Sequence, residues 1–134
     1  MVLQTQEELK IISESDIVQV RATVKRLIAG VGFSAVNQTK IVTAASELAR
    51  NTLDYGLGGS VKIEIVENGG RLGVRLRFED KGPGIADVQL ALKDGYTTGG
   101  GMGLGLSGSK RLMDDFAIQT QLGEGTTVMV TKWK

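Results

Sequence analysis

Two stretches in the first half of the chain repeat apolar residues every three or four positions, which is the spacing of a helix with one buried face. The first stretch covers about residues 16–29 and stops before Gly30, and the second covers about residues 35–55 and stops before Gly56. Glycine commonly follows the last turn of a helix. The sequence therefore predicts two helices, whose buried positions are Ile17, Val20, Val24, Leu27 and Ile28 in the first and Ile41, Ala44, Ala45, Leu48 and Thr52 in the second.

Apolar and polar residues then alternate in two segments, residues 61–65 and 72–79, as they do in strands with one buried face. The intervening residues 67–70 read Glu-Asn-Gly-Gly, which is the composition of a hairpin turn. We expect these two strands to pair antiparallel.

The rest of the chain predicts a third helix that reaches about Met113, then strands near residues 116–122 and 126–133 around a turn at 123–125. The predicted order is helix, helix, strand, strand, helix, strand, strand. Adjacent hairpins favour a mixed or antiparallel sheet over a doubly wound parallel one. We therefore expect an α/β (α+β) two-layer sandwich with the helices on one face of the sheet.

Length and composition narrow the class of protein. The 134 residues fit one compact domain, 1–134, and the net charge of +1 lacks the basic excess of a nucleic-acid binder. Cysteine and histidine are absent, which excludes thiolate metal sites and histidine-based chemistry within this chain. The first ten residues lack the layout of a signal peptide, and no apolar run could span a bilayer. We expect a cytoplasmic protein with neither a membrane nor a nucleic-acid partner.

Glycine is the anomaly of the composition, with 19 in the chain and seven of them in residues 95–108. A glycine loop that leads into a helix suits phosphate binding, because the first helical N–H groups are free and the helix dipole is positive there. The alternative is a flexible hinge without a ligand. Five glycines within residues 99–105 would carry a heavy entropic cost in a simple connector, which favours the phosphate-binding interpretation.

Two well-known phosphate motifs are nearly matched in the same segment. Residues 103–108 satisfy G-x-G-x-x-G, but no apolar strand precedes them, so a dinucleotide-binding Rossmann unit is rejected. Residues 103–110 also fall short of a P-loop, because the lysine does not directly follow the second glycine of the motif.

Glu47 and Asn51 are four residues apart in the second predicted helix and therefore lie on one ridge. A carboxylate beside a carboxamide oxygen is a suitable pair for Mg²⁺, which keeps waters and substrate phosphates as its other ligands. The alternative is an ordinary solvated helix edge, and the helix pattern alone favours that alternative.

Asp80 follows the strand at 72–79 and has the same parity as its inward-facing residues. Burying a carboxylate is unfavourable unless a donor meets it, and an adenine amino group would be such a donor. The alternative is that Asp80 opens the turn Lys-Gly-Pro-Gly, since aspartate is common at that position.

Taken together and in this order, the motifs resemble the GHKL ATPase superfamily, which includes DNA gyrase, Hsp90, MutL and the histidine kinases. The matching segments are residues 46–51, 80–85, 99–106 and 123–126. Residues 45–51 and 110–114 are similar to the small bacterial serine kinases of sigma-factor partner switching, especially the RsbT-type switch kinases of the stressosome. The resemblance implies a Bergerat-type fold with ATP and Mg²⁺ as cofactors.

The resemblance also implies a role for each matching position. Asn51 would coordinate Mg²⁺, Glu47 would act as general base or orient the attacking hydroxyl, and Asp80 would read the adenine amino group. Residues 86–98 would form a lid over the phosphates. The ATP-binding residues implied in this way are Asn51, Asp80, Gly82, Gly84, Ile85, Thr98, Gly101, Gly103, Leu104, Gly105 and Thr126. The lid contains no arginine, and the candidates for a cation at the γ-phosphate, each of which could equally be a solvated surface residue, are Lys93, Lys110 and Arg111.

The phosphate acceptor follows from the resemblance and from length. A histidine kinase needs a further helical domain and a gyrase-like enzyme needs a transducer domain, and neither fits in 134 residues. The resemblance implies a serine/threonine protein kinase for a STAS-domain partner, with a phosphatase as a second partner that it activates by binding. The alternative is a nucleotide-dependent anti-sigma factor that acts mainly by sequestering a sigma subunit.

Overall fold

The computed structural model describes residues 1–85, 92 and 102–134, with residues 102–105 described as backbone only. Residues 86–91 and 93–101, which include most of the predicted lid and the first part of the glycine segment, lie outside the described residues. The helices and strands, in chain order, are β1 (Val2–Ile11), α1 (Glu14–Ala29), α2 (Ala35–Asp54), β2 (Gly59–Asn68), β3 (Arg71–Asp80), α4 (Met102–Leu112), β4 (Asp115–Gln121) and β5 (Gly125–Trp133).

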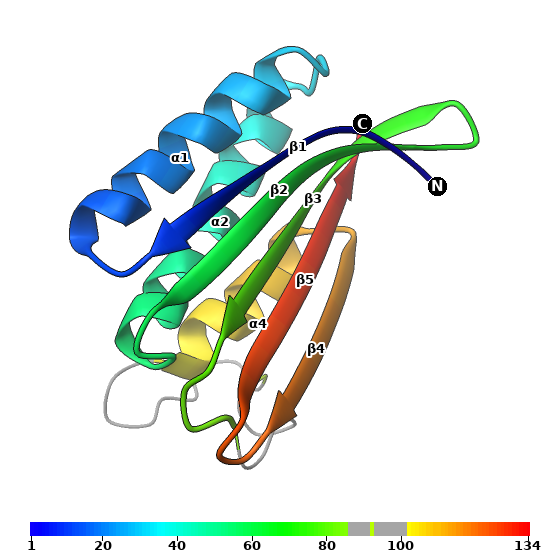
Figure 1. The fold of residues 1–134 in the computed structure, drawn as a ribbon. Coiled ribbons are helices and arrows are strands. Elements are labelled where there is room, and N and C mark those ends of the chain that lie inside the picture. The colour runs from blue at the N-terminus through cyan, green and yellow to red at the C-terminus, as the bar shows by residue number, and fades with distance from the viewer. Residues whose placement is uncertain (86–91, 93–101) are drawn as a thin grey trace.

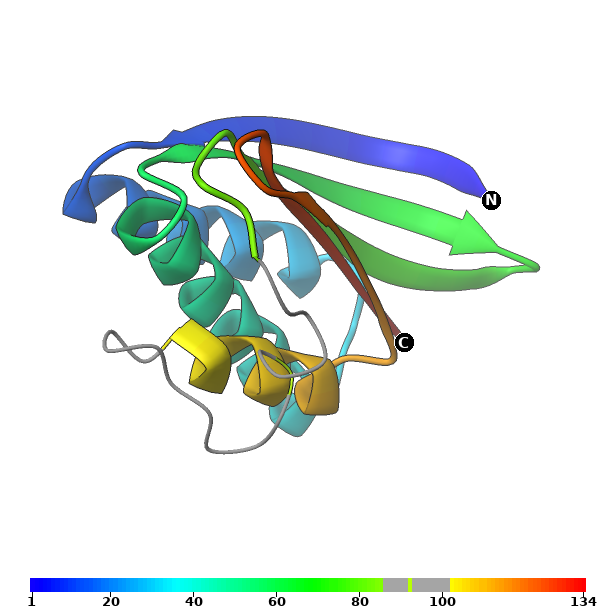
Figure 2. The same cartoon turned by 90° about the horizontal axis from the view of Figure 1, so that it is seen from below.

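The described strands form one five-stranded sheet in the order β1-β2-β3-β5-β4, and all four neighbouring pairs are antiparallel. Helices α1, α2 and α4 cover one face of this sheet, while the opposite face carries no described helix (Figure 2). The expected two-layer sandwich is therefore confirmed, in its antiparallel form. None of the described helices is long and apolar enough to cross a membrane.

The core lies between the helices and the inward-facing residues of the sheet. Alternate residues of β2, β3 and β5 are buried against α1 and α2, as strand geometry requires. The helix positions predicted as buried are so, except that Leu27 is partly buried. The sheet contributes Val61, Ile63, Ile65, Val74, Leu76, Phe78, Val128 and Val130 to this core.

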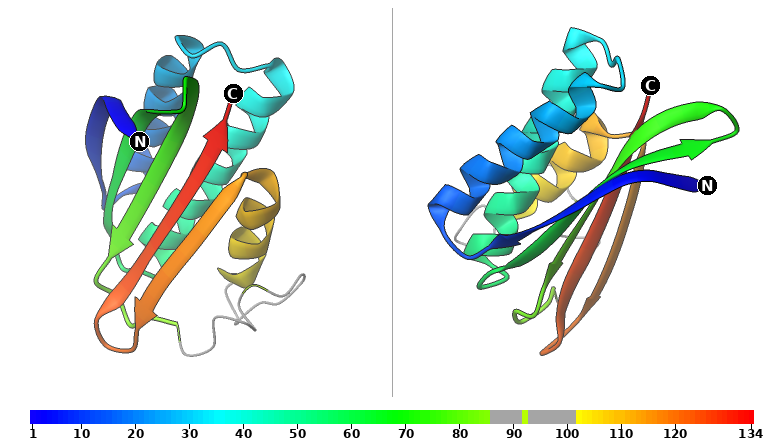
Figure 3. Two further views of the ribbon diagram at one scale, coloured as in Figure 1. Left: turned by 90° about the vertical axis from the view of Figure 1, so that its right-hand side faces the viewer. Right: turned by 45° about the horizontal axis from the view of Figure 1, so that its top comes forward.

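The predicted helices and the two predicted hairpins are confirmed, but the predicted element order was wrong at its start. Residues 2–11 form β1, an edge strand that pairs with β2 (Figure 3). Most of its side chains are exposed, and only Ile11 is fully buried. An edge strand is held by backbone hydrogen bonds to its neighbour, so its side chains need not alternate clearly and the sequence gives little signal.

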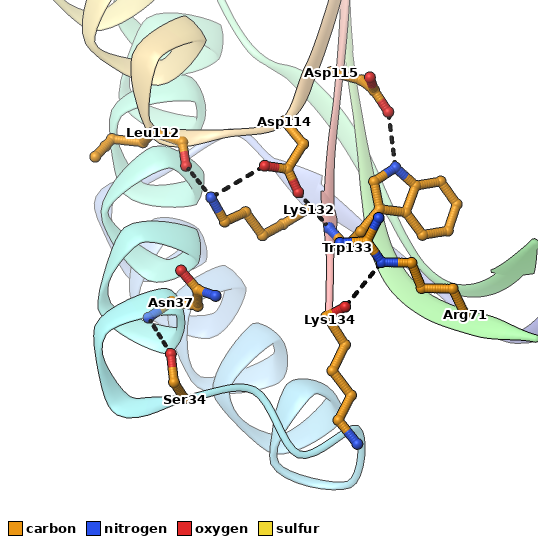
Figure 4. Close-up of polar contacts among 9 residues, drawn as sticks. All are labelled: Ser34, Asn37, Arg71, Leu112, Asp114, Asp115, Lys132, Trp133 and Lys134. Atoms are coloured by element: carbon orange, nitrogen blue, oxygen red, sulfur yellow. Dashed lines mark hydrogen bonds and ion pairs between the residues drawn. The ribbon is translucent and has the colours of Figure 1, made fainter.

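Lys132 ties the last strand to the end of α4. It occupies an inward-facing position of β5 and its side chain is only 10% exposed. Its ammonium group donates to the Leu112 carbonyl at 3.0 Å and lies 3.4 Å from a carboxylate oxygen of Asp114 (Figure 4). The other Asp114 oxygen accepts from the Trp133 backbone N–H at 2.7 Å. A positive charge at a helix C-terminus satisfies a free carbonyl and complements the helix dipole.

Replacing Lys132 with methionine is expected to lower the free energy of unfolding by about 1–3 kcal/mol, because the Leu112 carbonyl loses its donor in a buried place. The measurement is denaturant unfolding of the variant beside Lys25→Met, an exposed lysine of α1 whose replacement is expected to change stability by less than about 0.5 kcal/mol. Equal stability of the two variants would contradict the prediction.

Candidate nucleotide-binding site

The candidate site lies at one end of the sheet. The end of β3, the turn between β4 and β5, the end of α2 and the beginning of α4 are all found toward the lower end of the molecule in Figure 1. Segments that are far apart in the sequence therefore meet there. The glycine-rich segment leads directly into α4 at the same end.

Three polar residues form a row across the sheet at this end. Asp80 of β3 pairs with Thr126 of β5, and Thr126 pairs with Thr120 of β4. All three side chains are partly buried and have the parity of the core-facing residues. They contribute to a depression of about 360 Å³, whose lining residues are Asp80, Gln119, Thr120, Gln121, Glu124, Gly125, Thr126 and Thr127.

Asp80 both opens the turn after β3 and faces the core, which the sequence had left as two alternatives. Its carboxylate accepts a hydrogen bond from the Gly82 backbone N–H at 2.9 Å, so it opens the turn. It also stays on the inward side of β3, where burial raises the pKa of its carboxyl, while backbone N–H groups of Gly82 and Thr126 partly offset that rise in pKa. The turn-forming interaction leaves the second oxygen of the carboxylate for another donor.

Glycines allow the backbone to close around Asp80. A Cβ atom at Gly56 would overlap the Asp80 carboxyl group and would lie 2.6 Å from one of its oxygens. A Cβ atom at Gly82 would in turn lie 2.8 Å from the Gly56 Cα atom. Gly84 has a φ of 78°, a conformation that other residues rarely adopt. The end of α2 and the loop after β3 are thus packed against each other with glycine at each contact.

Thr120 anchors the same loop and was missed by the sequence interpretation. Its hydroxyl oxygen accepts a hydrogen bond from the Ile85 backbone N–H at 2.8 Å and lies 2.8 Å from the Thr126 hydroxyl oxygen. A second contact, from the Gly123 N–H to the Pro83 carbonyl at 2.9 Å, fastens the loop to the β4–β5 turn. Thr120 carries no sequence signal of its own, because threonine is common in strands and only the pairing of β4 with β5 places it beside Thr126.

Glu47 and Asn51 lie in α2 as predicted. Glu47 is exposed, whereas Asn51 is partly buried. The amide nitrogen of Asn51 is buried and has no hydrogen-bond partner among the described residues. Such a group is unfavourable unless something else completes it, so Asn51 has the properties of a residue that contacts a ligand.

Arg50, between Glu47 and Asn51 in α2, makes its hydrogen bonds to α1. It holds the Glu14 carboxylate at the beginning of α1 with two hydrogen bonds, one of them 2.8 Å long. This interaction lowers the pKa of Glu14. Arg50 therefore joins α1 to α2.

The glycine segment enters its helix earlier than predicted. Because α4 begins at Met102, Gly103, Leu104 and Gly105 belong to the first turn and a half of the helix rather than to the loop before it. Lys110 and Arg111 lie in its last turn, about 12 Å along the axis from Met102, and this placement does not favour contact with phosphates at the other end. Lys93, Thr98 and Gly101 lie outside the described residues.

Comparison with known proteins decides the family. Residues 36–134 match the sequence profile of the histidine kinase-, DNA gyrase B-, and HSP90-like ATPases. The chain belongs to this family. The match includes every candidate site residue named above, from α2 to β5.

Individual known proteins are also similar to most of the chain. Serine/threonine-protein kinase RsbT from Bacillus subtilis (strain 168) is 42% identical over 131 residues, 98% of each chain. An anti-sigma F factor from Geobacillus sp. (strain WCH70) is 30% identical over 120 residues, 84% of this chain and 81% of its own. The crystal structure of the RsbU and RsbW domains of Rv1364c from Mycobacterium tuberculosis has the same fold, with a TM-score of 0.66 and 20% identity, over 96% of this chain and 32% of that longer one.

The residues present fit the nucleotide that an ATPase of this family uses. Asn51 offers a buried donor that a phosphate oxygen would satisfy, and its carbonyl oxygen is a ligand of the type that Mg²⁺ takes. No group of three acidic side chains within the described ranges could hold a metal by itself. A magnesium ion here would accordingly depend on Asn51 and on the nucleotide for most of its ligands.

The raised pKa of Asp80 makes a prediction for the nucleotide-free ATPase domain. Because the pKa of Asp80 is higher in the folded state than in the unfolded state, folding favours the protonated carboxyl. Ionised Asp80 therefore lowers the free energy of unfolding at a pH above the folded-state pKa. This loss of stability disappears as the pH falls below the folded-state pKa. Asp80→Asn, which keeps an acceptor for Gly82, is expected to raise the melting temperature at about pH 7 and to do so less at about pH 4. The measurement is calorimetry at both pH values, with Glu8→Gln as an exposed control. A melting temperature that falls at about pH 7 would contradict the prediction.

Proposed function

We propose that this chain is an ATP- and Mg²⁺-dependent serine/threonine protein kinase that phosphorylates a STAS-domain partner in a partner-switching pathway. The observation that carries the proposal is the 42% identity with the serine/threonine-protein kinase RsbT over 98% of both chains. The arrangement of Asp80, Asn51 and Glu47 around one end of the sheet supports it.

The proposed roles follow the chemistry of each group. Asp80 accepts a hydrogen bond from the adenine amino group, while Gly82, Gly84 and Ile85 shape the base pocket and Thr126 supports the base. Asn51 holds the phosphates, directly and through Mg²⁺, which neutralises their charge when bound. Gly101, Gly103, Leu104 and Gly105 surround the phosphates where α4 begins, because free helical N–H groups favour anions. Thr98 would also bind ATP, and Lys93 is the proposed cation at the γ-phosphate.

Transfer requires little from the protein beyond positioning and removal of one proton. The substrate hydroxyl oxygen forms a bond to the γ-phosphorus, and the bond between that phosphorus and the β–γ bridging oxygen breaks, so that ADP leaves. The hydroxyl proton passes to the Glu47 carboxylate. The exposure of Glu47 supports this role, since a side chain that must reach a hydroxyl on another protein has to be accessible.

A second candidate function is that of a nucleotide-dependent anti-sigma factor, and the 30% identity with an anti-sigma F factor favours it. In that case the main activity is sequestration of a sigma subunit. The RsbT-like function is favoured because its relative is more similar and is matched over a larger share of the chain. A phosphatase is proposed as a further partner, and the cytoplasm as the location, where ATP and these partners are available.

The proposal is tested with the purified chain, γ-labelled ATP, Mg²⁺ and the STAS-domain proteins of the same organism. We expect label on a serine or threonine of one of them, and none when its hydroxyl residue is replaced by alanine. Co-purification with the organism's sigma factors, with no STAS protein labelled or bound, would overturn the kinase proposal and favour the anti-sigma function.

A further inference from the structure

Thr120 is the outermost member of the polar row, beside Thr126. It belongs to β4, the edge strand, and its partly buried hydroxyl makes three polar contacts. The Ile85 N–H lies at 2.8 Å, the Thr126 hydroxyl oxygen at 2.8 Å, and the Gly125 carbonyl oxygen at 3.2 Å. Three contacts use the full hydrogen-bonding capacity of a threonine hydroxyl group.

One arrangement of the hydroxyl protons makes all three contacts hydrogen bonds. A threonine hydroxyl has one proton and two lone pairs. The Ile85 N–H can only donate and the Gly125 carbonyl can only accept, so Thr120 accepts from the first and donates to the second. Its remaining lone pair must then accept the proton of Thr126. No other assignment makes all three contacts hydrogen bonds.

This assignment changes what Thr126 offers to a ligand. Its only proton points toward Thr120, so the lone pairs of its oxygen are left for the depression. Asp80, its direct neighbour across the sheet, is also an acceptor when ionised. The Asp80 and Thr126 side chains therefore present acceptors alone, which suits an amino group and is unfavourable for a carbonyl oxygen at the same place.

We propose that Thr120 is a positioning residue that gives the pocket its preference for a 6-amino purine over a 6-oxo purine, by holding the Thr126 hydroxyl as an acceptor. The inference rests on the proposed nucleotide-binding function and adds a determinant of base selectivity to it. Thr120 acts through Thr126 and through the anchored Ile85, and it does not itself contact the base.

The test compares the affinities of the chain for ATP and for inosine triphosphate, which carries a carbonyl oxygen where ATP carries the amino group. In Thr120→Val the Thr126 proton loses its acceptor and is free to rotate toward the ligand. We expect the ratio of the two dissociation constants to narrow about tenfold, the equivalent of one hydrogen bond. Thr120→Ser, which keeps the hydroxyl, is expected to retain the wild-type ratio.

Two further variants separate selectivity from stability. Thr5→Val makes the same replacement at an exposed position of β1 and is expected to leave the ratio unchanged. Thr126→Val removes the acceptor oxygen itself, so the ratio must narrow there too, even if Thr120→Val does not fold. A ratio that stays at the wild-type value in Thr126→Val or in folded Thr120→Val, or an equal loss of affinity for both nucleotides, would overturn the inference.

The outcomes also distinguish this inference from the proposed function. Because the assay measures binding alone, a narrowed ratio supports the inference even if no protein is phosphorylated. Phosphoryl transfer by a wild-type chain that does not discriminate between the two nucleotides would overturn the inference and leave the kinase function standing. A wild-type chain that binds neither nucleotide overturns both.

Discussion

Glu47→Ala is expected to lower the rate of phosphoryl transfer to the STAS partner by about 10²–10⁴-fold while ATP still binds. The reason is that Glu47 is exposed, and that its proposed role is in the proton transfer rather than in the walls of the pocket. Binding should depend instead on Asp80 and Asn51, which are both partly buried. The measurements are single-turnover transfer of labelled phosphate and the dissociation constant for ATP.

Glu8→Ala is the matched control, because Glu8 is also an exposed glutamate but belongs to β1 at the far edge of the sheet. It should change neither quantity. If Glu47→Ala transferred phosphate at the wild-type rate, the assignment of Glu47 as base would be wrong. If it lost ATP binding to the same extent as transfer, Glu47 would belong to the binding site instead.

Gly56→Ala is expected to reduce ATP affinity at least tenfold and to lower stability by about 1–3 kcal/mol, the usual effect of overfilling a packed site. The added methyl group overlaps the Asp80 carboxyl, and the backbone of Gly56 is itself packed closely against Gly82. Both the Asp80 carboxylate and the loop after β3 must then shift. Calorimetry and nucleotide titration measure the two effects.

The matched control is Gly108→Ala, in the middle of α4. A Cβ atom at Gly108 would meet no atom of the described residues within 4 Å, so the expected effect of the methyl group is a better helix propensity. Stability is expected to rise by up to about 1 kcal/mol. Gly56→Ala should thus lower the free energy of unfolding, whereas Gly108→Ala should raise it. The packing argument fails if Gly56→Ala behaves like Gly108→Ala.

The sequence was most informative where a periodic apolar pattern met a definite stop. Helix α2 was predicted to within one residue at its end, because its stripe from Ile41 to Thr52 is uninterrupted and Gly56 follows. The β2–β3 hairpin was equally clear from its alternation and its turn. These elements also carry Glu47, Asn51 and Asp80, so the sequence predicted on which helix or strand each of these three residues lies.

The remaining features depend on contacts that no local pattern encodes. β1 is held at the edge by β2 and has few buried side chains, so its residues look like an ordinary polar segment. Thr120 acquires its place only when β4 pairs with β5. The early beginning of α4 was missed because glycine is a poor helix former, and the helix forms there despite Gly103 and Gly105.

The strand order has a consequence for synthesis of the chain. β5 is the last strand in the sequence, yet it lies between β3 and β4 and supplies Thr126 to the pocket wall. While the ribosome is still translating β5, β3 has an unpaired edge and β4 has no partner in the sheet. A nascent chain can therefore form its helices and the β1-β2-β3 part early, but the pocket wall is complete only after β5 has emerged.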